Sequence, residues 1–177
     1  MGKKKNKIRE QQTFILFWNP EISNFKDEDL SDLVKSIRQH LEYEISWSIC
    51  DWQKANKGDR FFFIRCGMHN PEENGVFASG VFVSKPYVKE DGSGGGRKEH
   101  YVDLYFDKII DCNFCPVLSS VFIEKKIYDF DWHGGYSGRW LDVYRSYDLI
   151  SLWSHHSYKI SKDPKMSKKV YCPVLKY

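Results

Sequence analysis

The stretch TFILFWNP at residues 13–20 constrains the fold more than any other part of the chain. Its apolar residues follow one another without the spacing of a helix face, and Pro20 cannot continue a hydrogen-bonded ladder. The stretch therefore predicts a buried first strand that ends near Trp18 and Asn19. Aromatic residues make up 16% of the chain, and because rings favour strands over helices, we expect strands to dominate the core.

Apolar periodicity predicts further elements on both sides of a glycine-rich loop at residues 89–98. Strands are expected at 60–67, 75–84 and 100–109, the first two as an antiparallel pair, and helices at 27–41, 119–127 and 146–156. The stretch at 129–142 has the composition of a loop. Several strands around one core with helices at entry and exit predict a small mixed barrel or a strongly curved sheet.

Charge divides the chain into a body and two basic ends. Residues 1–9 and residues 159–177 each carry a net charge of +5, which leaves −7 in residues 10–158, since the whole chain carries +3. We therefore expect a basic N-terminal tail (1–12), one domain (13–158) and a basic C-terminal tail (159–177). The basic ends would therefore attract a ligand that contains phosphate, and the acidic body would not.

Five cysteines are an odd number in a chain large enough to bury a real core, so free thiols are expected rather than disulfides. No apolar run approaches the roughly 18 residues that a membrane span needs. The basic N-terminus lacks the apolar core of a signal sequence. We expect a cytoplasmic protein with no membrane partner.

Two indoles five residues apart, Trp47 and Trp52, are the strongest candidates for binding. Ring faces can stack a nucleobase for about 1–3 kcal/mol per base. The neighbouring residues Ser48, Ile49 and Asp51 add apolar and hydrogen-bonding groups, and a carboxylate can accept a hydrogen bond from an exocyclic amine. The alternative is that these rings belong to the core, where tryptophans usually pack.

A second candidate is the glycine-rich stretch FDWHGGYSGRW, because glycines let a backbone approach a ligand closely. Trp132 and Ser137 would then present polar edges to that ligand. The alternative is an ordinary turn between two elements.

Metal and nuclease chemistry find little support in the sequence, and we expect no cofactor and no metal. Cys112 and Cys115 have the spacing of a zinc knuckle, but no second pair of ligands follows at suitable spacing. Asp111 followed by Glu124-Lys125-Lys126 loosely matches the acidic pattern of metal-dependent nucleases. Such residues are also common on a solvated helix face.

The strand that ends in Trp18-Asn19-Pro20, the block WSICDWQKANKGDRFFFIRCG at 47–67 and the strand GVFASGVFVSKPY at 75–87 together resemble the EVE domain of the PUA-like superfamily. The resemblance covers roughly residues 13–158. It implies an α+β fold, a PUA-like curved mixed β-barrel with flanking helices, and a non-catalytic pocket for a nucleobase. YTH domains of the same superfamily hold methylated adenine in an aromatic cage.

The resemblance also implies positions for the pocket. Carried over by position, Trp47, Ser48, Ile49, Asp51 and Trp52 would line it, and Trp18, Asn19 and Ser79 would lie near its floor. Two features depart from the family pattern: Asp51 stands where the family often has Asn, and residues 89–98 look like an insertion.

We therefore expect a non-catalytic binding module that holds a nucleobase or nucleotide, with a modified base as the favoured ligand. Such a module would read modified DNA or RNA, and an effector protein would be its partner. The main alternative is a protein-interaction or regulatory subunit whose aromatics are structural. A metal-dependent nuclease is a third hypothesis, and it has the least support.

Overall fold

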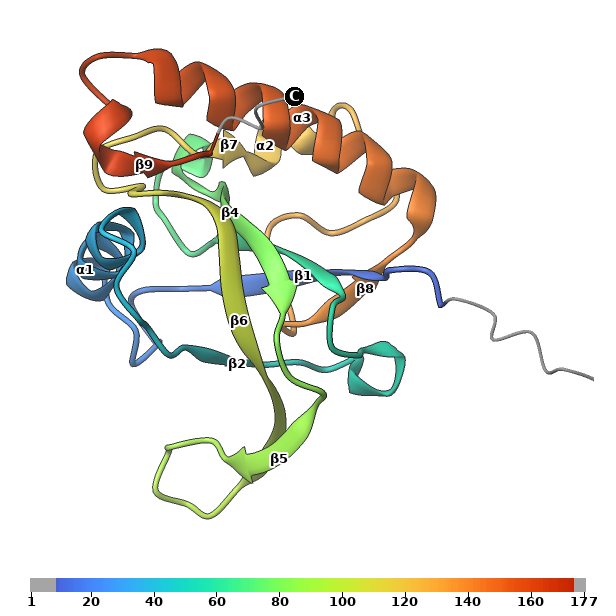
Figure 1. The fold of residues 1–177 in the computed structure, drawn as a ribbon. Helices are drawn as coiled ribbons and strands as arrows, with labels where there is room; N and C mark the ends of the chain where they lie inside the picture. Colours follow the sequence, from blue (N-terminus) through green and yellow to red (C-terminus); the bar gives the residue numbers. More distant parts are fainter. Residues whose placement is uncertain (1–8, 174–177) are drawn as a thin grey trace, which may run out of the picture.

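The central strands come from the apolar runs of the sequence. The computed structural model describes residues 9–173, and Figure 1 shows them as an α+β fold in which one curled mixed sheet is flanked by helices. The strands are β1 (Thr13–Trp18), β2 (Ser46–Ser48), β3 (Arg60–Arg65), β4 (Gly75–Phe82), β5 (Tyr87–Glu90), β6 (Lys98–Ile110), β7 (Leu118–Ser119), β8 (Arg139–Leu141) and β9 (Val170–Tyr171). The α-helices are α1 (Asp27–Arg38), α2 (Ser120–Glu124) and α3 (Val143–Lys162).

The sheet runs in the order β2-β6-β4-β3-β1-β8, with β5 and β9 paired to β6 and β7 paired to β4. Strands β1 and β3 are parallel, whereas the other pairs are antiparallel, including the predicted pair β3–β4. Strand β6 bends along its 13 residues, so its start pairs with β2 and β5 while its end pairs with β4 and β9. The long strand is therefore what curls the sheet.

The two outer strands of the sheet approach each other and nearly close the barrel. The backbone amides of Cys50 and Asp51 donate to the carbonyls of Ser137 and Gly138, at 2.9 and 3.1 Å. A Cβ on Gly138 would lie 2.3 Å from the Cα of Ile49, and the residue has a φ of +81°. The close approach that the glycine-rich stretch makes possible is thus to the chain itself.

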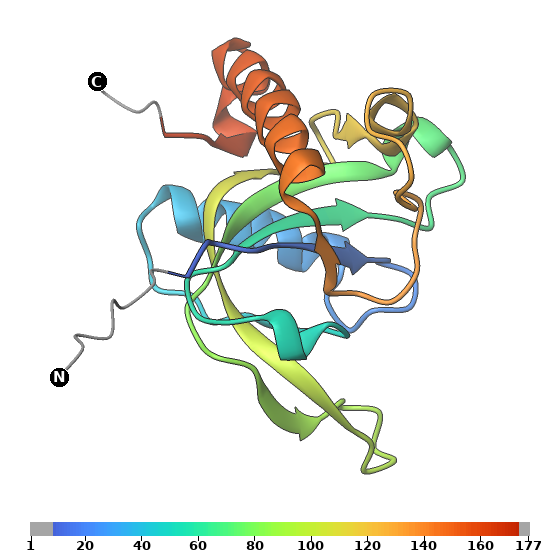
Figure 2. The ribbon, with the colours of Figure 1, turned by 90° about the vertical axis from the view of Figure 1, so that its right-hand side faces the viewer.

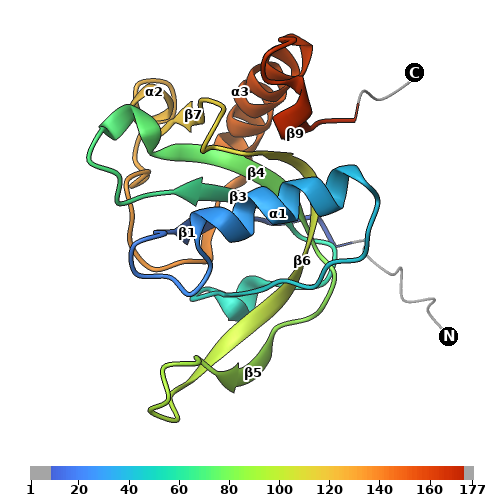
Figure 3. The ribbon, with the colours of Figure 1, turned by 90° about the vertical axis from the view of Figure 1, so that its left-hand side faces the viewer.

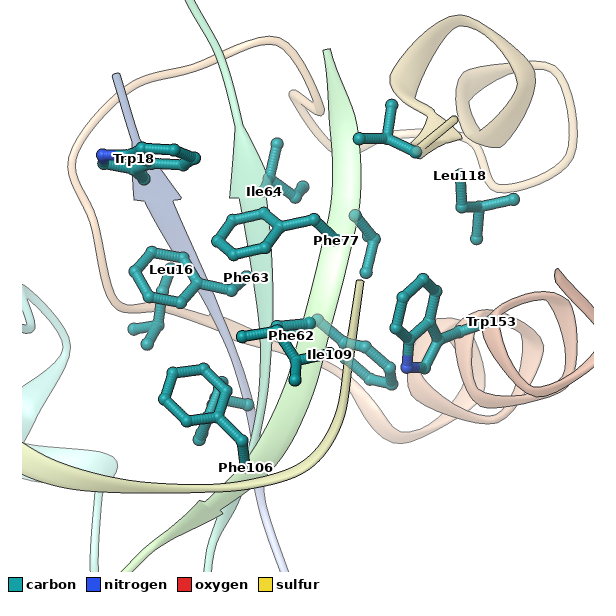
Figure 4. Packing of buried hydrophobic residues seen from close by; sticks show 14 of the residues in the cluster. Leu16, Trp18, Phe62, Phe63, Ile64, Phe77, Phe106, Ile109, Leu118 and Trp153 are labelled. Atoms are coloured by element: carbon teal, nitrogen blue, oxygen red, sulfur yellow. The ribbon is translucent and has the colours of Figure 1, made fainter. Parts of the chain in front are cut away.

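The core lies between the sheet, α1 and α3 (Figures 3 and 4). In β6, Val102, Leu104 and Phe106 are buried while Tyr101 and Tyr105 are not, as strand alternation predicts. Helix α3 contributes Trp153, which is 1% exposed and points toward the sheet in Figure 4. All five cysteines are free.

Several predicted boundaries differ from the structure. The helix predicted at 27–41 ends at Arg38, and Leu41 is 54% exposed. Helix α3 is longer than predicted, and the boundary at residue 158 falls inside it, since the chain continues through β9, which pairs with β6. The predicted loop 129–142 contains β8. Among the described residues, no helix combines the length and the apolarity that crossing a bilayer requires.

The N-terminal boundary at residue 12 is also displaced. Arg9 forms an ion pair with the buried carboxylate of Asp59, with 2.6 Å between Nη1 and Oδ1. The amide of Gln12 donates to the same carboxylate at 2.9 Å. Arg9 and Gln12 are therefore part of the folded body, and the rest of the predicted tail, residues 1–8, lies outside the described residues.

Candidate ligand-binding cleft

An open cleft of about 1190 Å³ lies between the loop that follows β1, strand β2 and the β5–β6 hairpin. The loop contributes Asn19 and Phe25, and β2 contributes Trp47 and Ser48. The hairpin, which projects from the body in Figures 1 and 3, contributes Tyr101 and the glycine-rich loop. Three segments far apart in the sequence thus form one site.

Trp47 is held rigidly in the wall of this cleft. Its indole Nε1 donates to the carbonyl of Phe17 at 3.1 Å. The ring meets Phe63 edge to face with 4.7 Å between centroids, and it meets Phe25 edge to face at 6.2 Å. The indole is half-buried, so part of its surface belongs to the core and part borders the cleft.

Trp52 borders a different hollow. A space of about 290 Å³ is lined by Ile49, Trp52, His100 and Tyr136. It shares Ser48, Arg97, Glu99 and Ser137 with the large cleft, so the two hollows adjoin. Trp52 is 37% exposed and stacks on His100 with 3.9 Å between ring centroids and 6° between planes. The two indoles therefore do not face each other as a clamp around a single base.

Three of the predicted site residues lie in the interior. Trp18 and Trp132 are 0% exposed, and each indole N–H donates to a backbone carbonyl. Ser79 is 1% exposed, and its hydroxyl accepts a hydrogen bond from Trp153 Nε1 at 2.8 Å. Neither hollow is lined by any of the three, so the expectation that they shape the pocket is corrected: they pack the core.

Asp51 also has a structural partner. Its Oδ2 accepts the backbone amide of Trp140 at 2.7 Å, which ties the segment after β2 to β8. The residue lines neither hollow. Ser137, in contrast, lines both of them, although its hydroxyl accepts the amide of Phe17 at 3.0 Å. Of the predicted residues, the structure brings Asn19, Trp47, Ser48 and Ser137 to the cleft, and Ile49, Trp52, Ser48 and Ser137 to the adjoining hollow.

The hairpin wall is the part of the site that the sequence did not assign. Tyr101 and Lys89 line the cleft, and the Lys89 ammonium lies 4.3 Å from the centroid of the Tyr101 ring. Tyr101 alternates along β6 with Val102, which is buried, and this alternation was the one sequence signal that its side chain lies outside the core. Arg97, in the glycine-rich loop, also lines the cleft.

The residues that the zinc and nuclease hypotheses singled out do not form a metal site. Within residues 9–173, no group of three or more His, Cys, Asp or Glu side chains could hold a metal ion. Burial raises the pKa of Cys112 to about 12 and that of Cys115 to about 11, so both thiols stay protonated. Asp111 is buried and accepts from the Ser31 hydroxyl, whereas Glu124 is exposed and pairs with His133 at 3.0 Å.

No family model matches the chain, and no curated protein matches it. A solved structure of the YTH domain-containing protein mmi1 with RNA is 14% identical, covers 86% of this chain and 85% of its own, and has a TM-score of 0.49. Rpa0253 from Rhodopseudomonas palustris is 9% identical, with coverages of 81% and 94% and a TM-score of 0.49. The YTH domain of Zygosaccharomyces rouxii MRB1 with N6-methyladenosine RNA is 11% identical, with coverages of 80% and 86% and a TM-score of 0.37.

At these scores the likeness assigns neither a family nor a ligand to this chain. None of the three structures is described as an EVE domain, so the EVE resemblance stays a prediction.

Proposed function

We propose that this protein is a non-catalytic binding module that holds a nucleobase or nucleotide in the cleft beside Trp47. One observation carries the proposal: an indole fixed by its own hydrogen bond forms part of the wall of an open cleft, with polar side chains beside it. Ligand pockets combine a fixed aromatic surface with a few polar groups in this way.

The chemistry of the lining suits a flat ring with polar edges. Trp47 and Tyr101 offer aromatic surface, while Asn19 and Ser48 supply groups that can donate or accept hydrogen bonds. Stacking on one such ring is worth about 1–3 kcal/mol, so a single base is held weakly unless its edge is also bonded. More specifically, we propose that the ligand is a modified base in DNA or RNA and that binding acts through an effector protein.

Tryptophan fluorescence tests the proposal directly. The full chain is titrated with nucleosides and short oligonucleotides, modified and unmodified, and we expect saturable quenching by at least one of them. The quenching should disappear in Trp47→Phe and persist in Trp140→Phe, because Trp140 lines neither hollow. Saturable quenching that survives Trp47→Phe unchanged places the ligand elsewhere, and no quenching by any of the probes refutes the proposal.

A protein-interaction role is the second candidate, favoured by exposed tyrosines near the start of α3. Tyr144 and Tyr147 are 80% and 67% exposed. Tyr128 is 69% exposed, and its carbonyl accepts Arg145 Nε at 2.7 Å, which holds it beside the helix. If this surface is the functional one, the double variant Tyr144→Ser/Tyr147→Ser loses the binding of a partner protein. Nucleoside titrations of the wild type then show no response.

A further inference from the structure

The cleft beside Trp47 carries more negative than positive charge. Its lining includes the carboxylates Asp29, Glu44, Glu90, Asp91 and Glu99, against the cations Lys89 and Arg97. Arg97 is already paired with Glu99 at 2.8 Å. That leaves four acidic residues in the lining against one ammonium, although Asp29 and Asp91 also accept the backbone amides of Lys26 and Ser93.

That ammonium rests on an aromatic ring. Lys89 Nζ lies 4.3 Å from the centroid of Tyr101 and donates to the hydroxyl of Ser46 at 2.5 Å. Burial and the charges of Glu99 and Asp91 raise the pKa of the Tyr101 hydroxyl, so the negative field reaches this ring. The exposed Lys89 side chain marks a place where the cleft stabilises a cation, and its exposure lets it be displaced.

We infer that the cleft selects a nucleobase that is positively charged at neutral pH, such as an adenine methylated at N1, over a neutral base. This inference rests on the proposed function and names the class of ligand. A cation over an aromatic ring gains about 0.5–2 kcal/mol. A carboxylate that lay 4 Å from the charge would add an attraction of about 1 kcal/mol even at the dielectric of water. A neutral base gains the stacking and the hydrogen bonds to its edge, but neither of these two charge effects.

The same charges disfavour phosphate inside the cleft. Lys98 and Arg97, at the rim next to the adjoining hollow, are the cations that a phosphodiester would reach. A flat base also suits the space better than a methylated ammonium on a peptide. Such a group is held by rings alone. This cleft is lined by four aromatic residues, Phe17, Phe25, Trp47 and Tyr101, but it also places the amide of Asn19 and the hydroxyls of Ser46 and Ser48 among them, and these polar groups suit the edge of a base.

Two methylated adenosines separate charge from methylation itself. N1-methyladenosine is cationic at pH 7, whereas N6-methyladenosine is neutral at that pH and carries its one added methyl group at another position. We expect the full chain to bind N1-methyladenosine about tenfold more tightly at low salt, in both the free nucleoside and a single-stranded oligoribonucleotide. A preference seen only in the oligonucleotide assigns the ligand to nucleic acid, and one seen in both admits free nucleosides; either supports the inference.

Equal affinities, or a preference for N6-methyladenosine, overturn the charge inference and leave the proposed function standing. No response to either methylated adenosine or to other nucleosides overturns the proposed function itself. A trimethyl-lysine peptide that binds more tightly than N1-methyladenosine overturns the choice of a base.

Charge-neutral variants locate the effect. Glu90→Gln/Asp91→Asn should reduce the preference for N1-methyladenosine by about three- to tenfold and change the affinity for N6-methyladenosine less than twofold. The matched control is Glu72→Gln/Glu73→Gln, which removes the same charge from exposed residues that do not line the cleft. Equal effects of both pairs would mean that the net charge of the protein, and not the cleft, sets the preference.

Discussion

Replacing Asp59 by Ala should destabilise the fold more than removing its ionic partner. The carboxylate of Asp59 is fully buried in the Lys57-Gly58-Asp59 turn and accepts four hydrogen bonds. Arg9 donates two of them, at 2.6 and 2.9 Å. The amides of Gln12 and Asn56 donate the others, at 2.9 and 2.7 Å. The turn thus holds the entry to β1 through backbone groups as well as through an ion pair.

The magnitude follows from which groups lose their partners. Asp59→Ala leaves the half-buried amides of Gln12 and Asn56 without acceptors, at about 1–3 kcal/mol each. The Arg9 side chain is 43% exposed and turns to water, so it adds little. We expect a loss of about 3 kcal/mol for Asp59→Ala. Arg9→Ala leaves both amide bonds in place. Because the guanidinium that pairs with the carboxylate is itself 43% exposed, we expect water to take its place, and the cost should be about 1 kcal/mol or less rather than that of a fully buried pair.

Urea unfolding followed by tryptophan fluorescence measures both variants, with the exposed Asp148→Ala as the control for the loss of a carboxylate. For a chain of this length a loss of 3 kcal/mol lowers Tm by about 6–12 °C. The reasoning fails if Arg9→Ala is as destabilising as Asp59→Ala, because the ion pair would then outweigh the amides. It also fails if Asp59→Ala stays within about 1 kcal/mol of the wild type.

Three further predictions concern the core and the cleft. Gly80→Ala should cost at least about 2 kcal/mol in urea unfolding, because its Cβ would lie 1.9 Å from the carbonyl oxygen of Tyr105 in the paired strand; a loss below 0.5 kcal/mol contradicts this. The pKa of the Cys112 thiol is raised from 9.0 to about 12, so the unfolded chain loses this proton at a lower pH than the folded one. The free energy of unfolding should therefore fall between about pH 9 and about pH 12, and it should fall less steeply in Cys112→Ala. Equal slopes for the two proteins contradict the assignment. Trp47→Phe leaves the carbonyl of Phe17 without its donor and should lower stability by about 1–2 kcal/mol, measured with Trp140→Phe alongside; no loss means that water replaces the indole N–H.

The strands were predictable because local pattern decides them. The apolar run at 13–18 and the alternation in 100–109 each leave one way to bury their side chains, and both strands form there. Strand β8 was missed because its three residues lie between Gly138 and Asp142 and resemble a loop. They become a strand only because the edge of β1 is available to pair with them. Long-range pairing of this kind has no signature in a short stretch of sequence.

The candidate site was predictable on one side only. Trp47 and Ser48 are neighbours in the sequence, so the sequence alone could assign both of them to one site. The wall formed by Tyr101 and Lys89 depends on how the β5–β6 hairpin folds back over the cleft. Trp132 was assigned to the site because an indole beside glycines suits a pocket. Its complete burial depends on how residues 129–142 pack against the rest of the fold, which the composition of the stretch does not reveal.

Trp47 can pack against the core and still bind a ligand, although the sequence alone presents these two roles as alternatives. Because the indole N–H is bonded to Phe17 and its ring contacts Phe63, the core fixes the orientation of Trp47 before any ligand arrives. A ring that is already immobile loses no rotamer freedom on binding, which lowers the cost of association. Trp52 stacks on His100 and is the more exposed of the two indoles, so the core fixes it less than it fixes Trp47. Packing Trp47 against the core is therefore what would make it an effective surface for a base, and loss of stability in a Trp47 variant does not argue against a role in binding.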